Sequence, residues 1–91
     1  MGAREFTRGR RVVARLAHGG DLLEEIAAVA EEHGMRTAEL RAIGALQAAR
    51  LAFYDQSAHE YGEFAVDAPV ELIGLLGNVS LKDGATFVHA H

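Results

Sequence analysis

Two histidines stand one residue apart at the end of the sequence, on either side of Ala90. If this segment forms a strand, His89 and His91 leave the same face, with their Cα atoms about 6.6 to 7 Å apart. Neutral imidazole nitrogens bind Zn²⁺ at about 2.0 to 2.1 Å, so the pair is suited to one divalent metal ion, with zinc as the first choice. The alternative interpretation is a pair of surface histidines without a ligand, because two protein ligands alone make a weak metal site.

The sequence pattern does not specify a third ligand. A third protein ligand with an open fourth position would give a site of the catalytic rather than the structural type. The ligand could come from a neighbouring subunit or from the α-carboxylate of His91. Within the chain, the candidate side chains are His18, His59 and Asp83.

A metal site of this kind supports two hypotheses of different classes. In the first, the protein is a small binding and assembly module. In the second, it is a small zinc-dependent hydrolase or lyase, in which the metal lowers the pKa of a bound water to about 7. The general acid or base of that enzyme would be Glu63, Glu71 or Tyr54. The sequence shows no cysteine, no glycine-rich nucleotide motif and no serine in a nucleophile elbow, so no catalytic residue is assigned and the binding module is favoured.

Basic residues are concentrated at the start of the chain. Five of the nine fall within the first fifteen positions, although the whole chain has a net charge of −4. Arg8, Gly9 and Arg10 spell the Arg-Gly-Arg core that an AT-hook lays in the A·T-rich minor groove, and Arg11 follows. These three arginines are the predicted nucleic-acid contacts. The proline of a hook is missing and the segment runs into a predicted strand, so a basic tail without hook activity is the competing interpretation.

The composition indicates one small domain. With 91 residues, 49% of them hydrophobic, the chain is long enough for a modest core but not for two. Because there is no cysteine, disulfides cannot add stability, which leaves a metal or oligomerisation to do so. No stretch approaches the roughly 20 apolar residues of a membrane span and no signal peptide is visible, so we expect a cytoplasmic protein without a membrane partner.

One helix is predicted with both of its ends. Asp21 can cap it, Glu24 stands three residues later in capping-box spacing, and Gly34 is suited to end it. The glutamates of this segment are interpreted as a solvated helix face rather than a metal site. The residues of the apolar face are Leu22, Leu23, Ile26, Ala27, Val29 and Ala30.

Strands are predicted before and after this helix. Gly44 is expected at a bulge or a close backbone approach, and Asp83 with Gly84 at the turn of a final hairpin. The order of one strand, one helix and then several sequential strands predicts an α+β domain with a mainly antiparallel sheet and a helix packed on one face. The strand segments are 12–17, 39–42, 50–53, 61–66, 70–81, which should lie inside the sheet, and the terminal segment with the two histidines.

From about Arg10 to His91 the chain resembles the plants-and-prokaryotes-conserved (PPC) domain, which in plants follows AT-hook motifs in nuclear proteins. The specific segments are AIGAL, GNVSLKDG with Gly77, Asn78 and Ser80, and the closing FVHAH. The resemblance implies an α+β fold, assembly into homotrimers and, because plant members are associated with DNA binding and transcriptional regulation, DNA as a candidate partner.

In prokaryotic members the His-x-His strand belongs to a histidine cluster suited to a metal, and the resemblance places His89 and His91 at two of its positions. It divides the chain into a basic arm, residues 1–9, and the domain, residues 10–91. Family members continue with further strands, including a Gly-Gly-His segment that would bring the third histidine. The sequence therefore resembles a PPC domain that lacks its last strands, and we expect exposed strand edges to favour oligomerisation or strand exchange.

Overall fold

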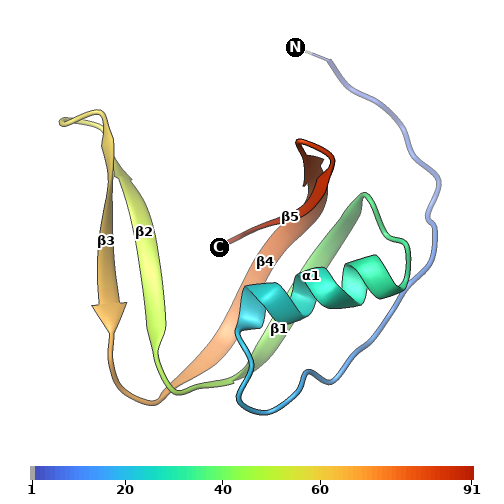
Figure 1. The fold of residues 1–91 in the computed structure, drawn as a ribbon. Coiled ribbons are helices and arrows are strands. Elements are labelled where there is room, and N and C mark those ends of the chain that lie inside the picture. Colours follow the sequence, from blue (N-terminus) through green and yellow to red (C-terminus); the bar gives the residue numbers. More distant parts are fainter. Residues whose placement is uncertain (1) are drawn as a thin grey trace.

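The computed structural model describes residues 2–91 and shows an α+β fold with one helix and antiparallel strands, as predicted. None of the helices in these residues is long and apolar enough to cross a bilayer. Figure 1 shows a helix lying across a three-stranded sheet, with a separate hairpin beside it. The elements in chain order are α1 (Leu22–Glu32), β1 (Ala38–Leu46), β2 (Ala49–Asp55), β3 (Glu60–Val66), β4 (Val70–Lys82) and β5 (Ala85–Ala90).

Helix α1 begins and ends where the sequence predicts. The Asp21 carboxylate accepts a hydrogen bond of 3.0 Å from the backbone N–H of Glu24, which satisfies one of the free donors of the first turn. At the other end Gly34 has a φ of +64°, the left-handed conformation that favours glycine. The N–H of Met35 then reaches the carbonyl of Ala30 at 2.8 Å and closes a Schellman motif.

The three-stranded sheet has the order β1-β4-β5, and both pairs are antiparallel. Strand β4 therefore lies between two neighbours, as its apolar sequence predicts. The register shifts between Ala42 and Gly44, where three residues of β1 lie opposite four residues of β4. The irregularity expected at Gly44 is thus present as a β-bulge.

The core lies between α1 and one face of this sheet. The buried apolar side chains are Ala30 of the helix and Leu75 and Val79 of β4, which are 3%, 8% and 4% exposed. The opposite face of the sheet, here called the open face, has no layer of described residues over it. Leu76, which alternates with Leu75 and Gly77, is 63% exposed there. A single covered face gives a small core.

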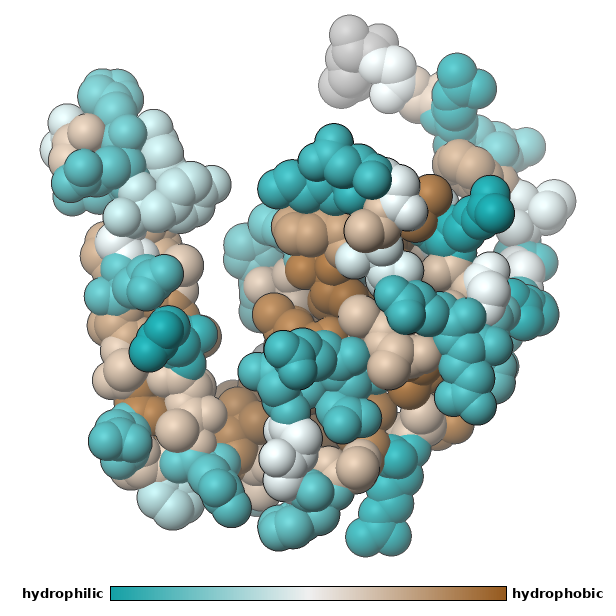
Figure 2. Space-filling model, in the orientation of Figure 1, coloured by the Kyte–Doolittle hydropathy of each residue, from teal (hydrophilic) through white to brown (hydrophobic). Residues whose placement is uncertain are grey.

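Strands β2 and β3 form a separate two-stranded hairpin. Figure 2 shows an open gap between most of the hairpin and the rest of the molecule, which it meets at one end. The pairing register brings the apolar side chains of both strands onto one face of the hairpin. The ring centroids of Phe53 and Phe64 on that face are 6.3 Å apart. Both side chains remain half exposed, so no part of residues 2–91 covers this face.

The prediction of a strand at residues 12–17 is wrong. This segment has no strand or helix, although Val12 and Leu16 are partly buried. A strand requires hydrogen bonds to a neighbouring chain segment, and no described segment pairs with this one. Alternating side chains indicate which face a strand would bury, but they do not supply the pairing partner that a strand requires.

Candidate metal centre

The two histidines lie at an edge of the three-stranded sheet, His89 in strand β5 and His91 directly after it. His89 lies opposite Asn78 of β4, and His91 continues the pairing just beyond the end of β5. The N–H of His91 donates to the carbonyl of Leu76 at 2.8 Å, and the N–H of Leu76 donates to the carbonyl of His91 at 2.9 Å. The backbone on both sides of Ala90 is therefore held by β4.

The two imidazole rings converge on the open face. Their Nε2 atoms are 3.2 Å apart, and the ring centroids are 5.0 Å apart with an interplanar angle of 71°. An ion about 2.05 Å from each nitrogen would make an N–metal–N angle of about 100° at this separation, close to the tetrahedral value. The donor pair thus fits a divalent ion. In the metal-free protein one neutral ring can donate its Nε2–H to the other.

Two rows of side chains cross the open face beside this pair. In one row Arg41 of β1 lies opposite Leu76, and Leu76 lies opposite His91. In the other, Glu39 lies opposite Asn78, which lies opposite His89. Both histidines are exposed, so the site lies on an open sheet surface rather than in an enclosed cavity.

Among residues 2–91, no third His, Cys, Asp or Glu joins the pair. His59, with a φ of +56°, lies between β2 and β3, and Asp83 lies in the turn between β4 and β5. His18 lies in the turn before α1. The carbonyl oxygen of His91 accepts from Leu76 and so points along the sheet. The three predicted side-chain candidates are therefore not brought to the site.

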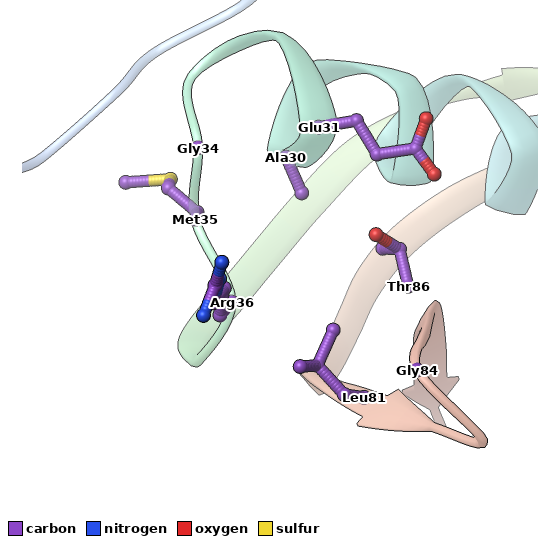
Figure 3. Close-up of a pocket in the computed structure, with 8 residues that line it drawn as sticks. All are labelled: Ala30, Glu31, Gly34, Met35, Arg36, Leu81, Gly84 and Thr86. Atoms are coloured by element: carbon purple, nitrogen blue, oxygen red, sulfur yellow. The ribbon is translucent and has the colours of Figure 1, made fainter.

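A pocket lies on the other side of the sheet (Figure 3). It has a volume of about 440 Å³ and lies between the end of α1 and the β4–β5 turn. Arg36, Glu31 and Thr86 contribute its polar groups, and neither His89 nor His91 lines it.

The candidate acids and bases of the enzyme hypothesis do not lie beside the two histidines. Tyr54 packs against Tyr61 in the hairpin. The carboxylates of Glu63 and Glu71 do not join the imidazole pair.

The three predicted nucleic-acid contacts lie in the segment before α1 that has no regular structure. Arg8 and Arg11 are exposed. The Arg10 guanidinium instead donates to the carbonyl of His33, the residue that caps the end of α1. A cation is favourable at this negative end of the helix dipole. Arg10 is thus engaged by the domain itself, a contact that the sequence did not indicate.

Gly77 belongs to the GNVSLKDG segment that carries the family resemblance, but the sequence indicates no role at the metal site for it or for Leu76, the β4 residues opposite the end of β5. Leu76 exchanges two backbone hydrogen bonds with His91, and Gly77 lies opposite Ala90. A glycine inside an apolar strand is a recognised sign of close backbone approach, and this signal could have identified Gly77.

Residues 3–91 match the model of the Plants and Prokaryotes Conserved (PCC) domain. No curated protein matches the chain significantly. Among solved structures, the metal-containing protein AF0104 of Archaeoglobus fulgidus is 39% identical, with a TM-score of 0.91 over 99% of this chain. A plant- and prokaryote-conserved (PPC) protein of Pyrococcus horikoshii is 37% identical, with a TM-score of 0.89 over 99% of this chain.

The chain spans less than the full length of these structures, 64% of the Archaeoglobus protein and 63% of the Pyrococcus protein. A candidate DNA-binding protein of Bacteroides thetaiotaomicron is 22% identical and has a TM-score of 0.68. The match covers 76% of this chain and 48% of that one, and at this identity it shows the shared fold alone.

Proposed function

Because the chain belongs to the Plants and Prokaryotes Conserved (PCC) domain family, we propose that it is an oligomeric metal-binding module in which His89 and His91 bind a divalent ion. The observation that carries the proposal is the 3.2 Å separation of the two Nε2 atoms on the open face. The metal-containing protein AF0104, 39% identical over nearly the whole chain, supports it. Zn²⁺ is the ion we propose, because it binds well to neutral imidazole nitrogens.

Two imidazoles leave the coordination sphere of zinc incomplete. Since no third His, Cys, Asp or Glu of residues 2–91 is at hand, the remaining ligands come from outside these residues, and we propose groups of a neighbouring subunit together with solvent. The exposed site lies at an edge strand, where a second chain has direct access. The metal and the assembly are therefore linked in this proposal.

The uncovered hairpin supports the proposed assembly. One of its faces is apolar along both strands, and Leu51, Phe53 and Phe64 of that face are 46%, 50% and 51% exposed. An isolated two-stranded hairpin is only marginally stable in water, so it requires a further packing layer. A second copy of the chain supplies that layer, and a homotrimer is the assembly that we propose from the family resemblance.

The first experiment is elemental analysis of tag-free protein purified without added metal. We expect about one zinc or other divalent ion per subunit, or a fixed fraction of one if subunits share the ion. The variant carrying both His89→Ala and His91→Ala should lose it. His33→Ala with His59→Ala is a matched control, because it removes two exposed histidines elsewhere. A metal-free wild-type protein, or metal retained by the first variant, would overturn the proposed site.

The proposed assembly is tested by sedimentation velocity at micromolar concentration. For a homotrimer, the molar mass obtained from sedimentation should be three times the 9.8 kDa of one chain. A monomer under these conditions would contradict the assembly, whatever the metal content.

We also propose that the protein associates with DNA through its N-terminal arginines. The exposed Arg8 and Arg11 remain available for phosphate contacts, whereas Arg10 is hydrogen-bonded to His33. Replacing Arg8 and Arg11 with alanine should weaken binding to a DNA duplex and reduce its salt dependence. Absence of duplex binding by the wild-type protein at low salt would remove DNA from the proposal.

A further inference from the structure

Wide and narrow strand pairs alternate along the β4–β5 ladder, and a narrow pair lies at the end of β5. Leu76 and His91 exchange both backbone hydrogen bonds and so form a hydrogen-bonded pair. Such pairs alternate along an antiparallel ladder, and the intervening pair, Gly77 with Ala90, is therefore the narrow, non-hydrogen-bonded type. The two histidines flank this narrow point.

There is no room for a side chain at Gly77. A Cβ atom added there would overlap the carbonyl oxygen of His89 and would lie 2.8 Å from both the Cα and the Cβ of Ala90. Two of these three atoms belong to the backbone of β5, so a rotamer change cannot relieve the overlap. The strand itself would have to move, at the residues that carry the imidazoles.

Gly74, three residues earlier in β4, provides the contrast. A Cβ atom added at Gly74 would meet no atom within 4 Å. Neither Gly74 nor Gly77 has a positive φ, so an alanine at either position has an allowed backbone conformation. The two glycines therefore differ in the space around them, and only Gly77 lies against β5.

We propose that Gly77 is the positioning residue of the imidazole pair. Its missing side chain lets β5 approach β4 closely enough to hold the Nε2 atoms of His89 and His91 3.2 Å apart, a separation that one metal ion can bridge. The effect on metal affinity rests on the proposed metal function. The effect on the geometry of the pair does not, because it concerns the metal-free protein.

The test compares Gly77→Ala with Gly74→Ala in two measurements. In the metal-free proteins, NMR hydrogen exchange reports the protection of the Leu76 and His91 amides, and nuclear Overhauser contacts report the proximity of the two rings. We expect Gly77→Ala to lose both signals while Ser80 and Lys82, which form hydrogen-bonded pairs with Phe87 and Ala85 farther along the ladder, keep their protection. Gly74→Ala should behave as the wild-type protein does.

The second measurement is Zn²⁺ affinity, determined by competition with a chelator at a temperature where circular dichroism shows each variant folded. Gly77→Ala should bind zinc about 10- to 100-fold more weakly than Gly74→Ala, the range typical when a group that orients a metal ligand is lost. Zinc would be used alone, without any other ligand.

Three outcomes would overturn the inference. They are unchanged His91 protection and ring contacts in Gly77→Ala, a loss of protection spread evenly along the whole β4–β5 ladder, and equal zinc affinity in the two glycine variants. If the wild-type protein binds no zinc, the proposed metal function fails, and the exchange and ring-contact measurements still decide the role of Gly77.

Discussion

The helix-covered sheet and the β2–β3 hairpin have similar local structure but very different burial. Both consist of antiparallel strands, with one register shift between β1 and β4 of the sheet, and both carry large apolar side chains. In the sheet, α1 covers one face, and Val79 is only 4% exposed. In the hairpin no layer of the described chain lies over Phe53 or Phe64, which stay half exposed. Correct pairing of strands therefore does not by itself produce a core, because burial requires a second layer.

The largest expected effect comes from placing a charge in the covered face. Val79→Asp would put a carboxylate between α1 and the sheet without a partner, which costs several kcal/mol and is comparable with the total stability of a small domain. We expect this variant to lose its cooperative thermal transition in circular dichroism.

Ile73→Asp is the control on the same strand. Ile73 is 89% exposed, so this substitution should change the free energy of unfolding by no more than about 0.5 kcal/mol within a single chain. Equal destabilisation by the two aspartates would show that the covered face is not the core of the protein.

An intermediate effect is expected from the apolar face of the hairpin. Phe53→Ser with Phe64→Ser should shift the proposed oligomer to monomers in sedimentation velocity, because this face loses most of its aromatic surface. The circular dichroism signal of α1 should persist, since the hairpin forms a separate sheet. If this variant loses the helix as well, the hairpin and the helix-covered sheet are one cooperative unit.

Tyr61→Ser is the matched control for the hairpin. Tyr61 lies opposite Tyr54 on the other face of the hairpin and is 75% exposed. The substitution should leave the oligomer intact if assembly uses the face with Phe53 and Phe64. Dissociation by Tyr61→Ser alone would assign assembly to the opposite face.

The smallest effects compare two aspartates with similar local roles. Asp21 caps α1, whereas the Asp55 carboxylate accepts from the N–H groups of Ser57 and Ala58 at 2.9 and 3.1 Å in the hairpin loop. Asp21→Ala should lower the free energy of unfolding by about 1 kcal/mol, measured by denaturant titration, because the helix belongs to the core. Asp55→Ala should mainly accelerate amide exchange at residues 57 and 58. A larger loss of global stability from Asp55→Ala would contradict the separation of the two regions.

The elements that the sequence predicts correctly depend on neighbours along the chain. Asp21, Glu24 and Gly34 indicate the ends of α1 because the capping hydrogen bonds join residues three to five positions apart. The turn at Asp83 and Gly84 is likewise a local feature of the backbone. The common side of His89 and His91 belongs to the same class, since strand geometry alone places residues i and i+2 on one face.

The incorrect or missing predictions depend on partners far along the chain. Residues 12–17 have the alternation of a strand but no pairing segment among residues 2–91, and Arg10 contacts His33 across 23 positions. The candidate ligands His18, His59 and Asp83 were chosen by chemical type, and the fold leaves all three away from the pair. Metal binding, trimer formation and DNA association stay predictions.

The sequence by itself determined the helix ends, the mainly antiparallel α+β architecture and the common side of the two imidazoles, because each follows from hydrogen bonding and side-chain alternation within short segments. Only the tertiary structure decided that this common side is the open face, that Leu76 holds the backbone of His91, and that Gly77 has no room for a Cβ atom. These features arise where β4 and β5 meet, and the distance between two strands is set by the side chains of both.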